Sequence, residues 1–203
     1  MKLGRISIPT FLKIRFSKNK AFLKKISNLL GFLPGNIDLY QQAFRHNSIA
    51  QDQSLEHGKT SNERLEFLGD AILDCVIAEF LFLKYPTKGE GFLTELRSKI
   101  VSRERLADLA SKMGLDQFLQ YDKSLRNNGP VIRSISGNAL EALIGAIYLD
   151  KGYPFTRRFI IQRILTVHLD VNALASAEFN FKSKLIEWAQ KNKKAVAFEV
   201  LQE

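Results

Sequence analysis

The 203-residue sequence has one cysteine, Cys75, and no hydrophobic run close to the roughly 18 to 20 residues that cross a bilayer. A lone cysteine excludes an intramolecular disulfide framework and fits a reducing compartment. Cys75 falls on the apolar side of a helical pattern, so packing is its expected role. A hydrophobic content of 45% is enough for a buried core, and the length suits one domain or one domain with part of a second.

Acidic residues are absent from residues 1–37, which carry +8 of the net charge of +9. Most of these cations belong to an N-terminal arm, residues 1–19, which suits a phosphate backbone or an anionic surface. The arm lacks the apolar core of a secretory signal, and it is too rich in Lys and poor in Ser for a typical mitochondrial transit peptide. We therefore predict a cytoplasmic protein with no membrane partner.

Strand patterns are essentially absent before residue 195, whereas helical spacing of apolar residues recurs. Asn36, Asn62 and Ser102 stand where helix N-caps are expected, and Gly114 stands where a helix should end. The pattern predicts helices over residues 20–30, 36–44, 61–84, 92–101, 102–113, 131–149 and 155–169. The expected fold class is all-α, with a helical domain over residues 20–171.

The most informative stretch is residues 62–73, with the sequence NERLEFLGDAIL. On a helix, Glu63, Glu66 and Asp70 share one narrow stripe, and no Lys or Arg follows at the spacing that would offset them. The opposite side is apolar, and Gly69 is expected to open the surface beside Asp70. Crowded carboxylates repel one another unless a cation lies between them, so a divalent metal site competes with a plain solvated face. The apolar residues expected on the opposite side are Leu65, Leu68, Ile72, Cys75 and Val76.

This stretch closely resembles the signature of the ribonuclease III family, metal-dependent endonucleases that cut double-stranded RNA. Residues 134–150 are similar to the second signature of that family, where an Asp and a Glu three residues apart complete the metal site. Asn138 stands where the family usually has Asp. The resemblance implies Mg²⁺ as cofactor, with Mn²⁺ as a substitute, and Asp70 and Glu141 as catalytic residues. The metal ligands that it implies are Glu66, Asp70, Asn138 and Glu141.

The resemblance also implies a helical-bundle endonuclease domain that forms a homodimer. Phe67 is similar to the family's aromatic dimer contact, and Glu63 and Glu90 are possible accessory acidic residues. His46 could be a ligand or a base, but a lone His at a helix end is more often a structural hydrogen-bonding residue, and we expect that role.

The character of the sequence changes after a weakly patterned linker, residues 172–178. Residues 179–203 resemble the opening helix and first strand, at 196–200, of an α/β double-stranded RNA-binding domain. They are too few for that whole domain, so we expect only its beginning. The alternative is a C-terminal helix that docks on the nuclease domain.

The expected function is Mg²⁺-dependent hydrolysis of double-stranded RNA that gives 5′-phosphate and 3′-hydroxyl ends, in ribosomal RNA maturation and other RNA processing. The alternative is a non-catalytic double-stranded RNA-binding or ribosome-associated protein on the same fold. Asn138 is the main argument for that alternative, and the three retained carboxylates are the main argument against it. A generic helical interaction domain would leave both signatures unexplained.

Overall fold

The computed structural model describes residues 20–52, 61–176 and 181–198. All regular elements in these ranges are helical, and an isolated bridge pairs Arg45 with Gln120. The predicted all-α class is confirmed for the described residues. The chain divides into two compact units, residues 1–169 and 170–203. The basic arm, residues 1–19, lies outside the described residues.

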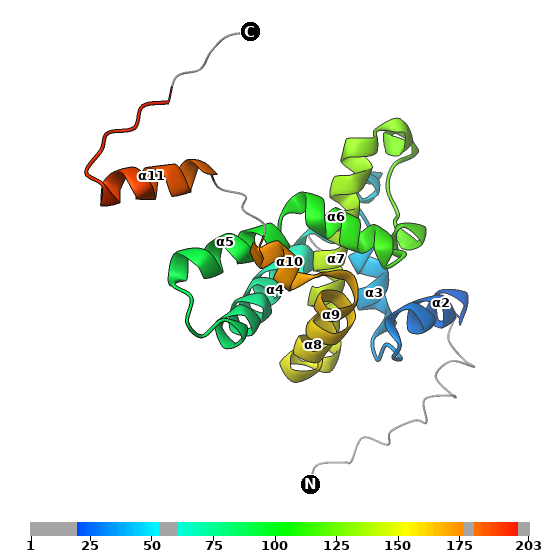
Figure 1. Cartoon of the computed structure of the whole chain (residues 1–203). Coiled ribbons are helices and arrows are strands. Elements are labelled where there is room, and N and C mark those ends of the chain that lie inside the picture. The colour runs from blue at the N-terminus through cyan, green and yellow to red at the C-terminus, as the bar shows by residue number, and fades with distance from the viewer. Residues whose placement is uncertain (1–19, 53–60, 177–180, 199–203) are drawn as a thin grey trace. The chain divides into compact units, whose positions relative to one another are not determined.

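The helices of the first unit follow the predicted ranges closely (Figure 1). The main departure is the last predicted helix, which the structure divides into α8, a π-helical segment η4 and α9. The helices are α2 (Lys20–Leu30), α3 (Ile37–Ala43), α4 (Glu63–Lys84), α5 (Glu90–Ile100), α6 (Arg103–Lys112), α7 (Gly129–Lys151), α8 (Tyr153–Phe159), η4 (Ile160–Leu165) and α9 (Thr166–His168). Shorter 3₁₀ segments are η1 (Asn47–Asp52), η2 (Leu115–Phe118) and η3 (Lys123–Asn127).

Helix α7 is the centre of the core. It packs against α3, α4, α6 and α8, and its contact with α4 is the most extensive between any two helices of the described chain. An apolar helix that is covered on most sides is expected at the centre of a helical domain. Its fully buried residues include Ala139, Leu140, Ala142, Leu143, Ile144, Ala146 and Ile147.

The crossing of α4 and α7 depends on two glycines, Gly69 and Gly145. A Cβ atom on Gly69 would overlap the backbone carbonyl of Glu141, and one on Gly145 would overlap the carbonyl of Leu65. The two backbones are therefore in direct contact. Our expectation that Gly69 opens the surface beside Asp70 was wrong, because Gly69 is buried in this crossing.

The predicted apolar face of α4 was only partly right. Leu65 and Val76 are buried as predicted, but Leu68 and Ile72 are half-buried and Cys75 is exposed. The Cys75 Sγ atom lies 3.7 Å from the Tyr153 hydroxyl rather than in the core. The buried side is rotated toward α7 because the close approach is centred on Gly69. The buried residues of α4 are Leu65, Gly69, Leu73, Val76, Ile77 and Leu81.

The three predicted residues all stand at helix N-cap positions, and one of them makes a side-chain capping bond. The Asn36 side chain accepts a hydrogen bond from the Asp38 backbone N–H at 3.3 Å. Asn62 and Ser102 occupy the N-cap positions of α4 and α6, but neither side chain makes a capping hydrogen bond. Asn62 is buried, and its amide donates to the Ala43 carbonyl at 3.4 Å, which ties α4 to the end of α3.

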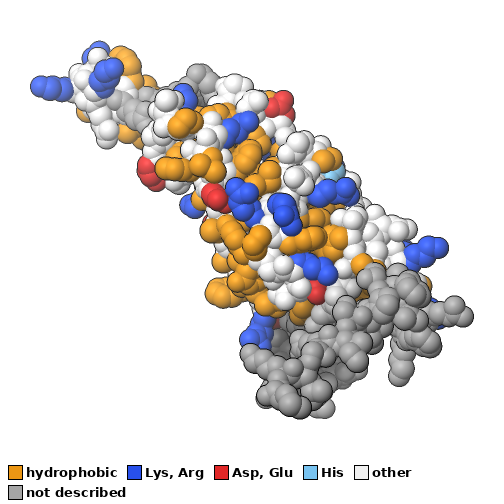
Figure 2. All heavy atoms as spheres, turned by 90° about the horizontal axis from the view of Figure 1, so that it is seen from below, with side chains coloured by type: hydrophobic (Ala, Val, Ile, Leu, Met, Phe, Trp, Pro, Cys, Tyr) orange, Lys and Arg blue, Asp and Glu red, His pale blue; other side chains and the backbone are white. Residues whose placement is uncertain are grey.

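The exposed surface is both apolar and basic in places. Figure 2 shows one face on which hydrophobic side chains gather over the middle, with several Lys and Arg side chains and few acidic ones beside them. Helix α4 contributes exposed aromatic residues of its own, Phe67 and Phe82. None of the described helices combines the length and the hydrophobicity that a bilayer crossing requires.

The second unit contains α10 (Val171–Ser176) and α11 (Phe181–Lys191). Helix α11 agrees with the opening helix expected within residues 179–203. Residues 196–198 of the predicted strand have no regular structure, and the rest of that strand lies outside the described residues. The expected α/β beginning is therefore not observed. A strand forms only against a neighbouring strand, and the described residues contain none.

Candidate active site

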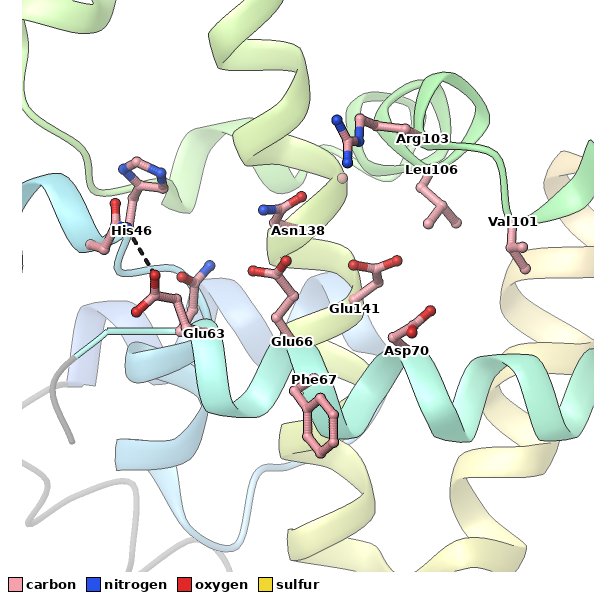
Figure 3. A pocket seen from close by; sticks show the side chains of 13 residues that line it. His46, Glu63, Glu66, Phe67, Asp70, Val101, Arg103, Leu106, Asn138 and Glu141 are labelled. Atoms are coloured by element: carbon pink, nitrogen blue, oxygen red, sulfur yellow. Dashed lines mark hydrogen bonds between the residues drawn. The ribbon is translucent and has the colours of Figure 1, made fainter. Parts of the chain in front are cut away.

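A cavity of about 570 Å³ opens where α4, α6 and α7 meet the segment that follows α3 (Figure 3). Carboxylate, amide and guanidinium groups line it together with a few apolar side chains. The lining residues are His46, Asn47, Asn62, Glu63, Glu66, Phe67, Asp70, Val101, Arg103, Leu106, Gly137, Asn138 and Glu141.

The structure brings the predicted metal ligands together in this cavity. Glu66 and Asp70 lie one turn apart on α4, and Asn138 and Glu141 lie one turn apart on α7. Figure 3 shows all four side chains on the side of their helices that faces the cavity. They meet because the glycine crossing places the acidic stripe of α4 against Asn138 and Glu141 on α7.

The carboxylates of the cavity destabilise one another's charged forms. Burial, followed by the nearby charges of Asp70 and Glu66, raises the pKa of Glu141 to about 7, and Arg103 opposes this rise. Burial, followed by Glu63, raises the pKa of Glu66. Burial raises the pKa of Asp70 as well. These are the environments in which a carboxylate gains most from a nearby cation.

Asn138 interacts with the cluster through its amide. The Asn138 side chain forms a hydrogen bond with Glu66 that lowers the pKa of that carboxyl, against the larger effect of burial. An amide offers one oxygen and one NH₂ group, so Asn138 can support a neighbouring carboxylate or present an oxygen, but it brings no charge.

Of the two possible accessory acidic residues, Glu63 lines the cavity and Glu90 does not. Glu63 is at the rim of the cavity, where it accepts hydrogen bonds from Asn47 Nδ2 at 2.9 Å and from Ser61 Oγ at 3.0 Å. Glu90 is outside the cavity, in the first turn of α5, and accepts a hydrogen bond from Thr94 Oγ1 at 2.8 Å. The structure therefore does not bring Glu90 to the site.

His46 lines the cavity but has a structural role, as predicted. Its Nδ1 atom lies 2.9 Å from Ser48 Oγ and accepts from the Ser48 backbone N–H at 3.2 Å. Its own backbone N–H donates to the Gln120 carbonyl at 2.8 Å. Burial lowers its pKa, against a weaker opposing effect of Glu63, which favours the neutral form of the ring.

Sequence reasoning missed Arg103, the first residue of α6. Its side chain lines the cavity near Glu66 and Glu141 and lowers the pKa of both. Nothing in the local pattern distinguishes Arg103 from an ordinary solvent-exposed arginine. Only the packing of α6 beside α7 places it among the acids.

The donor set of the cavity fits a hard divalent cation. Mg²⁺ prefers carboxylate and amide oxygens, keeps several of its waters, and is usually held directly by only one or two carboxylates. Within the described residues, no three His, Cys, Asp or Glu side chains converge into a complete ligand group. A cation in this cavity would therefore be held partly through water, and Glu66, Asp70 and Glu141 supply the charge.

Phe67 lies beside the acids on α4 and is 81% exposed. Figure 3 shows its ring directed away from the carboxylates. It is unusual for a large aromatic side chain to have so much of its surface in water on an isolated domain.

Comparison with known proteins shows which family the chain is similar to. A family model described as Ribonuclease-III-like matches residues 36–168. The protein named Ribonuclease 3 from Bacteroides fragilis is 44% identical over 192 residues, which cover 95% of this chain and 65% of that protein. Ribonuclease 3 from Flavobacterium psychrophilum is 41% identical over 194 residues, which cover 95% of this chain and 77% of that protein. The chain thus spans less than two thirds of the Bacteroides relative's length.

A solved structure extends the likeness to three dimensions. The crystal structure of the nuclease domain of ribonuclease III from Campylobacter jejuni superposes with a TM-score of 0.61 at 35% identity, and the match covers 73% of this chain and 95% of that one. Both signatures and the acidic cavity between them lie within residues 36–168, the part of the chain that the family model matches. This chain belongs to the ribonuclease III family.

Proposed function

We propose that the chain is a metal-dependent endonuclease that hydrolyses double-stranded RNA and leaves 5′-phosphate and 3′-hydroxyl ends. One observation supports this most: carboxylates from two helices, Glu66 and Asp70 on α4 and Glu141 on α7, face one open cavity with raised pKa values. A fold that needed these acids only for solubility would have no reason to crowd them together.

The chemistry follows from the charges in the cavity. Mg²⁺, when bound, would supply a water of lowered pKa and neutralise charge on the phosphate and the leaving oxygen. Glu66, Asp70 and Glu141 would hold the ion. Burial, followed by the neighbouring negative charges, raises their pKa values in the protein alone, and the same negative charges would attract the cation.

Asn138 is expected to weaken the metal site without removing it. Its hydrogen bond with Glu66 favours the ionised form of that carboxyl, and its oxygen remains available, but the cavity has one negative charge fewer than the family pattern implies. We therefore propose that the enzyme needs more Mg²⁺ than a site with Asp there. Mn²⁺, which accepts weaker oxygen and nitrogen ligands, should support a higher rate than Mg²⁺.

The first test is incubation of the protein with a long, uniform RNA duplex in Mg²⁺ and, separately, in Mn²⁺. We expect short duplex products whose 5′ ends become available for labelling only after phosphatase treatment. Matched single-stranded RNA and double-stranded DNA should stay intact. An uncut duplex at every metal concentration would reject the nuclease function.

We also propose a homodimer. A related ribonuclease III from Campylobacter jejuni shows structural flexibility in a region of its nuclease domain that is involved in dimer formation. In this chain Phe67 offers an exposed aromatic contact beside the acidic cavity. Phe67→Ala should therefore weaken self-association by about 3 kcal/mol. Light scattering across a dilution series measures this change, and Leu149→Ala, an exposed apolar residue on α7, is the control.

A non-catalytic double-stranded RNA-binding protein is the second candidate, and Asn138 is the observation that favours it. Such a protein would bind the duplex without cutting it, and Asn138→Asp would not restore cleavage.

Ribosomal RNA precursors are the proposed substrates of the whole protein, and α11 is the proposed beginning of its RNA-binding domain. The boundaries at residues 19, 171 and 178 remain predictions.

A further inference from the structure

The cavity is lined by one basic side chain and four acidic ones. Arg103 is the single Lys or Arg among the lining residues, opposite Glu63, Glu66, Asp70 and Glu141. A phosphate that entered this cavity would meet mainly negative charge. Apart from the Mg²⁺ of the proposed function, the positive group that the cavity offers to a phosphate is Arg103.

The guanidinium is available for a ligand. Arg103 lies close enough to Glu66 and Glu141 to lower their pKa values, yet within the described residues it forms no ion pair and no side-chain hydrogen bond. Two other arginines already have acidic partners: the exposed Arg133 pairs with Asp108 at 2.7 Å, and the half-buried Arg157 pairs with Glu79 at 2.6 Å. Figure 3 shows the Arg103 side chain above the carboxylates, on the far side of the open space.

We propose that Arg103 binds the RNA phosphate that lies in the cavity and holds it against the carboxylate side of the site. A guanidinium presents its donors as a planar fork that matches two phosphate oxygens, which a single ammonium group cannot do. This inference rests on the proposed function, because it assigns Arg103 a role toward the same substrate. It adds a positioning contact from α6 to a site otherwise formed by α4 and α7.

A purely electrostatic role in the free protein is the main alternative. In that case Arg103 would only reduce repulsion among the acids, and its loss would lower stability without changing the contact with RNA. Arg103 is exposed and begins its helix, so replacing it should leave the fold intact.

The test uses the full chain, a short RNA duplex, and the variants Arg103→Gln, Arg103→Lys and Arg105→Gln. Arg105 lies on the same helix outside the cavity and is the matched control. Duplex affinity is measured across a salt series with Ca²⁺ in place of Mg²⁺, after confirming that the RNA stays intact. Arg103→Gln should reduce the slope of log affinity against log salt concentration by about one unit, as expected when one phosphate interaction is removed. Arg105→Gln and Arg103→Lys should leave that slope unchanged.

The second readout is the single-turnover rate in Mg²⁺. Arg103→Gln should slow cleavage about 10- to 100-fold, and Arg103→Lys should recover only part of it because the fork is lost. An unchanged salt slope in Arg103→Gln, or an equal change in Arg105→Gln, would overturn the proposal. A wild type that binds RNA but never cuts would reject the nuclease function, while the slope would still decide the role of Arg103.

Discussion

Two carboxylates on α7, Glu141 and Asp150, have opposite environments within one helix. Burial and neighbouring acids raise the pKa of Glu141 to about 7. Asp150 is also largely buried, which by itself would raise its pKa, but its hydrogen-bond donors reverse that effect and the pKa of Asp150 is lowered.

Asp150 has a partner for each of its oxygens. It accepts from the backbone N–H groups of Gly35 at 2.8 Å and Asn36 at 3.0 Å and from the Tyr40 hydroxyl at 2.9 Å. The Lys151 ammonium lies 3.2 Å away. Asp150 thus fixes the turn before α3 to the end of α7, and it is a structural acid.

The difference shows how to separate functional from structural carboxylates in this fold. A structural acid such as Asp150 has its donors built into the protein. Glu66, Asp70 and Glu141 have raised pKa values and lack such a set of donors, which is what we expect of acids that bind a cation. The following predictions test that distinction.

The largest expected effect is the loss of cleavage in Glu141→Gln. The substitution keeps the size of the side chain but removes the charge that would attract the cation, so the rate should fall by about 1000-fold or more. Duplex binding should survive, because it depends on contacts elsewhere. The assay is single-turnover cleavage, with Glu104→Gln on α6 as the control, and a rate near wild type would remove Glu141 from the site.

The next effect is on stability. Asp150→Ala leaves two backbone N–H groups and the Tyr40 hydroxyl without their acceptor, which should cost about 3 kcal/mol of unfolding free energy. Urea denaturation measures it. Below the unfolding transition the variant should cleave RNA at nearly the wild-type rate. A loss below about 1 kcal/mol would mean that Asp150 is not the anchor described here.

The third prediction concerns pH in the metal-free protein. The pKa of Glu141 is higher in the folded than in the unfolded protein. The contribution of this carboxyl to the free energy of unfolding is therefore fully present below the unfolded pKa of about 4.3 and is lost as the pH rises through about 7. Glu141→Gln should therefore be more stable than wild type by about 1 to 2 kcal/mol at pH 8, after allowing for solvent, and equal to it near pH 4.

Asp150 should show the opposite dependence. Its lowered pKa gives stability that is present above the unfolded pKa of about 3.9 and is lost as the pH falls through the folded value. Denaturation curves of wild type, Glu141→Gln and Asp150→Ala across the pH range would measure both slopes. Parallel curves would contradict the distinction between the two acids.

The smallest effect is expected at Asn138. Asn138→Asp adds a fourth carboxylate and removes the amide that supports Glu66, so it should lower the Mg²⁺ concentration for half-maximal rate about fivefold. Asn138→Ala, which offers no oxygen, should require more Mg²⁺ than wild type. The measurement is the cleavage rate of wild type and both variants as a function of Mg²⁺ concentration. Identical midpoints in all three would show that residue 138 has no effect on metal binding.

Much of the site could be predicted from the sequence because it depends on local spacing. Residues three and four apart share a helix face, so the stripe of Glu63, Glu66 and Asp70 follows from the sequence alone. The exposure of Phe67 beside that stripe follows from the same geometry. The cap at Asn36 was predictable because an Asx side chain needs only its own neighbouring N–H groups.

The sequence by itself therefore determined the helices, their acidic faces and the side on which Phe67 lies. Only the tertiary structure decided that Gly69 and Gly145 form a backbone crossing, that Cys75 faces outward and that Arg103 joins the acids. The physical reason is range: helix periodicity is fixed by bonds between residues four apart, whereas a crossing depends on two surfaces far apart in the chain fitting together. A glycine in a helix pattern looks the same whether it meets solvent or another backbone until the second helix is in place.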